Sequence, residues 1–277
     1  MINVNYYIFL LLIYLFINVP ILRSEEKHTY NFVNLTIMND TLYAIDLDNN
    51  GYSFPTYIYK FDSCKILRMN NCYYDEIPKS ISLMKGLEEI KIIECFNLNY
   101  SKTFQNLSNN NISKLSLIND SLKEIPSEIK YLPKLKDLYL SNNQISIIPK
   151  EVFNLENLQS IRINENKITT FDLDKNIMSI NSLYLTKCGL TKLPLGIEHL
   201  CNLKFLGLPD NNNLALEEIC EVVKNFENIE TLIITGCKKN KIPPNIENLK
   251  IVKKKIIAEF MFTDKEVILL RSKGIKI

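Results

Sequence analysis

Apolar residues recur along the chain in copies of 22 to 26 residues, and every copy follows one pattern. Positions 1, 4 and 6 hold Leu, Ile or Met at 26 of 27 sites, and Cys64 fills the remaining one. The alternation of positions 4 and 6 predicts a short strand that buries one side. The nine copies begin at Leu42, Cys64, Leu87, Ile112, Leu135, Leu158, Ile180, Leu203 and Ile229, and Leu249 begins a degenerate tenth.

A second column, position 9, contains only Asn, Cys and a single Asp. A short polar side chain where the chain turns inward can bond backbone groups that would otherwise be buried unpaired, and Cys fits the same slot as a weak donor. We therefore expect this column to form a structural ladder. Its members are Asn50, Cys72, Cys95, Asp120, Asn143, Asn166, Cys188, Asn211 and Cys237. Position 15 is Pro in five of the nine copies, which supports the same frame.

This frame resembles the leucine-rich repeat family, whose repeat reads LxxLxLxx(N/C)xLxxIPxxIxxLxxL, over residues 42 to about 256. Its 23-residue IPxxIxxLxxL form is similar to that of the Ras-suppressor group. The resemblance implies an α/β solenoid: a curved horseshoe with a parallel concave sheet, short helices or turns on the convex side and a C-terminal capping helix. Because one repeat cannot bury its own apolar edge, neighbouring copies must stack.

The frame divides the chain into four parts. Residues 1–24 contain an apolar run of fourteen residues that ends at Pro20. A membrane span needs about 20 residues, so the run matches the core of a signal peptide, with an uncleaved anchor as the alternative. We expect an N-terminal cap over 25–41, nine repeats over 42–248, and a degenerate repeat with a C-terminal cap over 249–277.

Two copies depart from the pattern on the convex side. The copy that begins at Leu87 replaces the usual segment with FNLNYSKTFQNLSNNN, which predicts a bulge. The copy that begins at Leu203 carries LEEICEVVKNFEN, whose spacing predicts a true helix. Near the C-terminus, Thr263 and Glu266 predict a capping box, and Gly274 predicts the end of the capping helix.

Cysteines and sequons bear on the compartment. Many extracellular members of the family carry disulfide-bonded caps, whereas this chain has no Cys before Cys64 or after Cys237. Repeat type and thiols thus favour a reducing compartment, while the leader favours export. We follow the leader and predict a secreted, extracellular protein; the alternative is a chain anchored to the membrane by the uncleaved leader. Candidate N-glycosylation sites are Asn34, Asn39, Asn99, Asn106, Asn111 and Asn119.

Composition and motifs argue against several functions. Lys and Arg number 33 against 31 Asp and Glu, so no field of one sign exists to grip a nucleic acid. The abundance of Asn and Lys follows A/T-rich codons, and we give it no functional weight. The two histidines are far apart, and no metal, phosphate or nucleophile motif is found. We expect no catalysis, no cofactor and no metal site.

The repeat instead predicts a binding surface, because positions 3, 5 and 7 face outward on the concave side. Position 5 brings Tyr139, Arg162 and Tyr184 onto consecutive rungs, with Phe205 beside them at position 3. Tyr and Arg dominate interface hot spots, although exposed strands also favour Tyr. We predict partner-binding residues Arg68, Tyr139, Arg162, Tyr184 and Phe205. The function is then a secreted, non-catalytic protein-binding module for an unknown partner; the alternative is a membrane-anchored or cytosolic scaffold or regulator.

Overall fold

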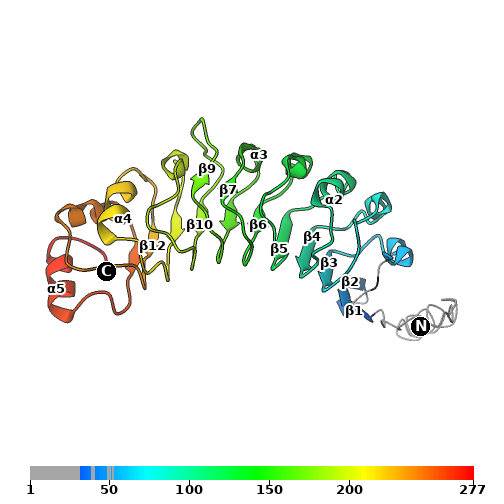
Figure 1. The fold of residues 1–277 in the computed structure, drawn as a ribbon, viewed down its shortest axis with the longest axis horizontal. Helices are drawn as coiled ribbons and strands as arrows, with labels where there is room; N and C mark the ends of the chain where they lie inside the picture. Colours follow the sequence, from blue (N-terminus) through cyan, green and yellow to red (C-terminus); the bar gives the residue numbers. More distant parts are fainter. Residues whose placement is uncertain (1–31, 39–40, 49–50, 52) are drawn as a thin grey trace.

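A computed structural model describes residues 32–38, 41–48, 51 and 53–277. These form a curved arch with strands along its inner side and helices and turns along its outer side (Figure 1). The leader, the first part of the N-terminal cap, Asn39 and Asn50 lie outside the described residues. The arch confirms the solenoid with a parallel concave sheet that the repeat predicts.

The described part of the concave sheet has eleven strands. β1 pairs antiparallel with β2, and each later strand lies parallel to the one before it. In order across the sheet they are β1 (Phe32–Met38), β2 (Thr41–Asp48), β3 (Ile66–Asn70), β4 (Glu89–Ile93), β5 (Lys114–Ile118), β6 (Asp137–Tyr139), β8 (Ser160–Arg162), β10 (Ser182–Tyr184), β11 (Phe205–Gly207), β12 (Thr231–Ile233) and β13 (Lys255–Ile257). A small second sheet joins β7 (Ile147–Ile148) to β9 (Thr170–Phe171).

The strand register follows the sequence frame rung by rung. At position 4, Leu138 pairs with Ile161, which pairs in turn with Leu183. Residues at positions 4 and 6 of all nine copies are buried and belong to one continuous apolar core. Each such side chain contributes about 1.5–3 kcal/mol by leaving water, so the stacked copies stabilise one another.

The tenth rung begins later than the sequence pattern indicates. In β13, Ile256 pairs with Leu232, which occupies position 4 of the ninth copy. Position 1 of the tenth copy therefore falls at Lys253 instead of Leu249. Leu249 lies in η5, fully buried, and fills an apolar position of the convex segment of the ninth copy. An apolar residue at a convex core position looks the same in sequence as the start of a strand.

Helical turns cover the convex side. They are η1 (Thr56–Lys60), η2 (Lys79–Leu83), α2 (Tyr100–Asn106), η3 (Ser127–Tyr131), α3 (Lys150–Phe153), η4 (Ile197–His199), α4 (Leu216–Val223) and η5 (Pro244–Ile251). Four of them follow an extended Pro at position 15, where the ring fixes φ just before the helical turn. The predicted helix in the eighth copy is confirmed as α4. The predicted bulge in the third copy is a true helix, α2, whose N-cap Asn99 accepts a hydrogen bond from the Lys102 N–H (3.0 Å).

The two ends of the array are covered differently. At the C-terminus, α5 (Asp264–Ser272) has the predicted capping box between Thr263 and Glu266, and Gly274 ends it with φ +83°. Leu270 of α5 is fully buried, which closes part of the core. At the other end the array is extended by β1, whose antiparallel pairing the sequence pattern did not indicate.

Ladder side chains join each rung to the one before it. Asn143 Nδ2 donates to the carbonyls of Leu117 (2.9 Å) and Leu140 (3.0 Å), while its Oδ1 accepts from the N–H groups of Asp120 (3.1 Å) and Leu122 (3.0 Å). Cys95 donates to the Ile93 carbonyl of its own copy (3.3 Å), whereas the other three ladder thiols use the same acceptor as Asn143, the position-6 carbonyl of the preceding copy, through a single longer bond. Those bonds are 3.1 Å for Cys72, 3.3 Å for Cys188 and 3.3 Å for Cys237.

Just before the ladder, position 8 turns the chain through the left-handed region. Its φ lies between 50° and 60° at eight residues and is 76° at Gly236. A left-handed conformation costs an L-residue about 1–2 kcal/mol, least for Asn. The members are Asn71, Glu94, Asn119, Asn142, Glu165, Lys187, Asp210, Gly236 and Phe260. Only one of these described residues is Gly, so residue type alone does not reveal this turn.

Candidate partner-binding surface on the concave face

Three predicted residues at position 5 and one at position 3, Phe205, lie in contact near the middle of the concave sheet. Tyr139, Arg162 and Tyr184 are in register on β6, β8 and β10. The Arg162 guanidinium carbon lies 5.0 Å from the Tyr139 ring centre and 4.3 Å from the Tyr184 ring centre. The Tyr184 and Phe205 rings follow at 4.5 Å with an interplanar angle of 32°. We name Tyr139, Arg162, Tyr184 and Phe205 the arginine–aromatic row.

Gly207 on β11 lets the last two rings lie close to the sheet. It is the position-5 residue beside Tyr184 and is buried. A Cβ at this position would lie 3.2 Å from the Phe205 ring and 3.5 Å from the Tyr184 ring. The lack of a side chain at Gly207 therefore leaves room for the Phe205 and Tyr184 rings. The sequence pattern did not reveal this role.

Arg68, also predicted to bind a partner, is not part of the row. Its strand, β3, lies three rungs from β6, and its guanidinium donates to the Asp46 carboxylate at 2.8 Å. The sequence pattern in turn missed Lys114, whose Nζ lies 5.4 Å from the Tyr139 ring centre and 3.2 Å from the Glu89 carboxylate. Two cations on the N-terminal half of the concave face, Arg68 and Lys114, are thus paired with carboxylates, whereas Lys91 makes no ion pair within the described residues.

The candidate glycosylation residues fall into two groups. The side chains of Asn34, Asn99 and Asn111 are exposed. Asn106 instead donates to a backbone carbonyl of the preceding copy (2.9 Å), and Asn119 donates to a glutamate carboxylate (2.8 Å). A glycan on either of the last two would have to displace a bond that joins neighbouring copies. The Asn34 amide also donates to the Asp48 carboxylate (3.3 Å), so Asn99 and Asn111 are the better candidates among the described residues.

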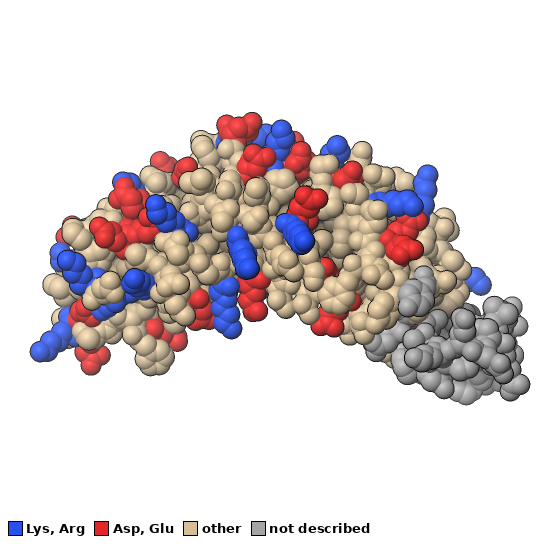
Figure 2. All heavy atoms as spheres, in the orientation of Figure 1, with Lys and Arg blue, Asp and Glu red and all other residues tan. Residues whose placement is uncertain are grey.

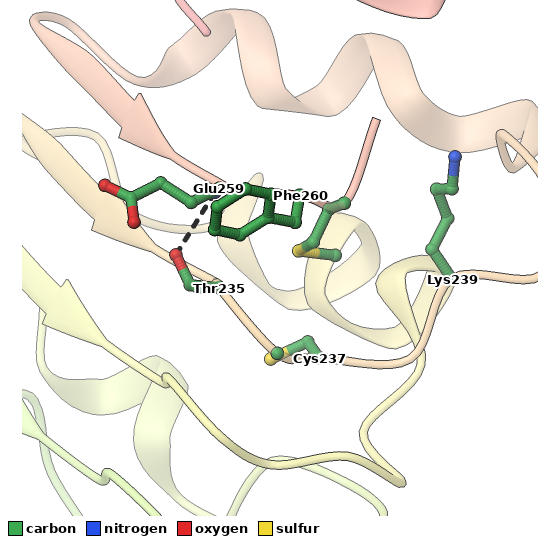
Figure 3. A pocket seen from close by; sticks show the side chains of 7 residues that line it. Thr235, Cys237, Lys239, Glu259 and Phe260 are labelled. Atoms are coloured by element: carbon green, nitrogen blue, oxygen red, sulfur yellow. Dashed lines mark hydrogen bonds between the residues drawn. The ribbon is translucent and has the colours of Figure 1, made fainter. Parts of the chain in front are cut away.

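A small hollow of about 310 Å³ between the last two rungs (Figure 3) shows how polar groups of the described residues serve the fold. The Glu259 N–H donates to Thr235 Oγ1 (3.3 Å), and Lys239 is paired with Glu266 at 2.6 Å. Burial raises the pKa of the Cys237 thiol to about 12. A thiol that stays protonated is a poor nucleophile. Cys237 therefore does not supply a reactive group to this hollow.

Two further buried thiols and the described histidine also lack the features of catalytic groups. Burial raises the pKa of Cys188 to about 11 and that of Cys220 to about 12. His199 Nδ1 lies 3.0 Å from the Asn176 side-chain oxygen on the convex side. Within the described ranges, no three His, Cys, Asp or Glu side chains gather closely enough to hold a metal ion. The arrangement can support contact with a partner better than it can support bond-breaking chemistry.

A larger concavity of about 820 Å³ lies on the flank of the solenoid, beside α4. Gly189 leaves space there, since nothing lies within 4 Å of where its Cβ would be. Lys167, Lys192 and the 72% exposed Leu195 line it. This flank concavity is the main competitor of the arginine–aromatic row as a docking surface.

Charge is spread evenly over the visible face of the molecule. Figure 2 shows Lys and Arg interspersed with Asp and Glu along the whole arch, in keeping with the net charge of +2. Association is therefore not steered by a field of one sign, and local geometry decides recognition.

Among the described residues, no helix combines the length and apolar character that crossing a bilayer requires.

The comparisons with known proteins agree with this fold. Residues 133–175 match the family model for leucine-rich repeats, in two copies. Comparison with curated proteins finds no match to the chain. The chain is similar in structure to the leucine-rich repeat domain of the type III effector XopL, at 21% identity and TM-score 0.60, covering 78% of this chain and 75% of that one.

Two further solved structures share the architecture. An internalin (inlF) from Listeria monocytogenes matches at 16% identity and TM-score 0.54, over 78% of this chain and 59% of its own. The structure of the TLR13–ssRNA13 complex matches at 20% identity and TM-score 0.59, over 79% of this chain and 32% of its own. At these identities the likeness is one of fold.

Proposed function

We propose that this leucine-rich-repeat solenoid is a non-catalytic protein-binding module that holds a protein partner on its concave face, at the arginine–aromatic row. The observation that carries the proposal is the position of Arg162, held between two tyrosine rings on adjacent strands. Large aromatic residues and Arg supply most of the binding energy at protein interfaces. Here the three rings are half-buried, Arg162 is exposed, and all four side chains are clustered on the sheet, so little side-chain entropy is lost on binding.

We further propose that the leader directs export, so that the partner is extracellular. This part rests on the apolar run that ends at Pro20. Mass spectrometry of the mature chain, purified from its own cell, is expected to find an N-terminus near Glu25. An intact leader in the membrane fraction would favour the anchored scaffold, and an intact leader in the soluble fraction would favour a cytosolic regulator.

Site-directed photocrosslinking tests the binding face. A photoreactive amino acid placed at Tyr184 should crosslink the partner in the native setting, and the product can be identified by mass spectrometry. The same group placed at Tyr131, 42% exposed on the convex η3, is the matched control. Crosslinks from Tyr131 alone would place the partner on the convex side and contradict the proposal.

Affinity for the identified partner then tests the row itself. The double variant Tyr139→Ala/Arg162→Ala should weaken binding roughly tenfold or more, because two hot-spot side chains are removed. The convex pair Lys130 and Tyr131, whose cation and ring are 5.4 Å apart, offers a matched double-alanine control that should bind normally. Undiminished affinity with intact circular dichroism would move the site away from the row, with the flank concavity as the next surface to test.

A further inference from the structure

The concave cations of the described sheet differ in how they are satisfied. Arg68 is paired with Asp46 and Lys114 with Glu89. None of the ion pairs or hydrogen bonds found within the described residues involves the Arg162 guanidinium, whose side chain is exposed. A planar donor group is therefore left available in the middle of the face. Lys91 on β4, three rungs away, also makes no ion pair within the described residues, but its ammonium group cannot form a planar fork.

Stacking determines which part of Arg162 remains available. The rings of Tyr139 and Tyr184 lie 5.0 Å and 4.3 Å from the guanidinium carbon and leave the N–H donors at its edge uncovered. That edge forms a planar fork that matches the two oxygens of a carboxylate. Asp137 is diagonal to Arg162, one rung and two residues away, and makes no ion pair with it. The fork is thus ordered before any partner arrives.

An apolar platform adjoins the fork. Beyond Tyr184 the sheet presents the Phe205 ring, the side-chain-free Gly207 and then the half-buried Ile233, which pairs with Gly207 across β11 and β12. Two rungs separate Arg162 from Gly207. At about 4.8 Å per rung this is roughly 10 Å, the length of three residues of extended chain at about 3.3 Å each.

We propose that the row recognises an extended segment of the partner in which an Asp or Glu is followed three positions later by an apolar residue. The carboxylate accepts two hydrogen bonds from Arg162, and the apolar side chain packs on the platform of Tyr184, Phe205 and Ile233. A carboxylate fits better than a phosphorylated residue, because the row supplies one unpaired cation and no second one. This inference rests on the proposed function and specifies the partner of the same site.

Pooled synthetic peptides test the chemistry with the full chain. One pool has the form X-(Asp/Glu)-X-X-(Leu/Phe)-X, and a matched pool replaces Asp and Glu by Asn and Gln. Fluorescence anisotropy should show the acidic pool binding about tenfold more tightly than the amide pool, as expected for a charge-assisted bidentate pair. Equal binding of the two pools, or no binding of the acidic pool, would overturn the inference. Tighter binding of a phosphoserine pool would overturn the choice of carboxylate.

Variants assign the preference to Arg162. Arg162→Met should abolish the preference for the acidic pool, and Arg162→Lys should reduce it because an ammonium cannot form the planar fork. Arg68→Met, which removes an already paired cation, should leave the preference intact. A preference that survives in Arg162→Met would refute the assignment. If the partner crosslinks at Tyr184 while the pools bind alike, the binding face stands and only the chemistry is wrong; a crosslink from Tyr131 alone refutes the proposed function itself.

Discussion

The N-terminal rungs and the central rungs of the solenoid share one frame but are stabilised differently. From β3 to β5 the strands have five residues each, the ladder consists of two thiols and a carboxylate, and two of the concave cations, Arg68 and Lys114, are paired with carboxylates. From β6 to β11 the strands have three residues each, three of the four ladder positions are Asn, and Arg162 is stacked between rings.

The contrast indicates how a repeat protein can keep a surface available for binding. In the central rungs, buried amides beneath the sheet hold the copies together, so the side chains above it need not bond to one another. In the N-terminal rungs the ladder is weaker and the concave charges bond across strands. The candidate binding surface accordingly lies where the buried ladder is strongest.

The largest expected effect is on the ladder of the central rungs. Asn143→Leu removes four short hydrogen bonds and leaves buried backbone groups unpaired, so we expect the free energy of unfolding to fall by about 3 kcal/mol. Cys95→Ala, in the N-terminal rungs, removes only long thiol bonds and should cost about 1 kcal/mol. Urea unfolding measures both losses, and equal values would show that the amide ladder is no stronger than the thiol ladder.

An intermediate effect concerns Asp120, the only carboxylate among the described ladder residues. Burial raises its pKa from 3.8 to about 6 in the folded chain, although the Cys95 N–H donates to it at 2.7 Å. The folded state therefore holds this proton more tightly, and stability present below pH 3.8 is lost as pH rises through 6.

Asp120→Asn should remove that loss. Compared with the native chain, the variant should gain about 2 kcal/mol of unfolding free energy between pH 4 and pH 7, as linkage requires for this shift. Thermal or urea unfolding at the two pH values gives the result. Parallel pH profiles for the two proteins would show that the carboxylate does not weaken the N-terminal ladder.

The smallest expected effect concerns position 8, where the contrast runs the other way. The rungs from β3 to β5 use Asn at two of three positions, whereas the rungs from β6 to β11 use it at one of four, and Glu165 and Lys187 there hold left-handed φ values of 56° and 54°. Lys187→Gly should raise the unfolding free energy by about 0.5–1 kcal/mol by relieving that strain. Lys167→Gly, at a position without positive φ, should be neutral or destabilising, and a gain there would show that strain is not the cause.

Much of the fold could be predicted because it depends on periodic burial. The apolar positions determine which residues face the core, so the frame also gives the strand register and thereby the neighbours of Arg162. The capping box at Thr263 and the helix α4 follow from local side-chain chemistry. Contact between Arg162 and the two tyrosine rings follows from register alone, since adjacent position-5 side chains stand one rung apart.

The remaining features depend on information that a single repeat pattern does not carry. The left-handed turn at position 8 accepts Lys and even Phe260, so composition hides it. Leu249 matches both a strand start and a convex core position, and only stacking against the ninth copy decides between them. Asn residues discounted as codon bias bond neighbouring copies: Asn157 donates to Pro133 O (2.9 Å) and Asn202 to Met178 O (3.0 Å).

Copy length varies from 22 to 26 residues, yet positions 1 to 9 keep one spacing in all nine copies. Insertions such as α2 and α4 have accumulated only on the outer side of the arch. The spacing of the strands on the inner surface is consequently unaffected by changes in the length of a copy. During evolution, or in protein engineering, a new specificity can arise by exchange of the outward side chains at positions 3, 5 and 7, while each rung keeps its place and its distance from the next.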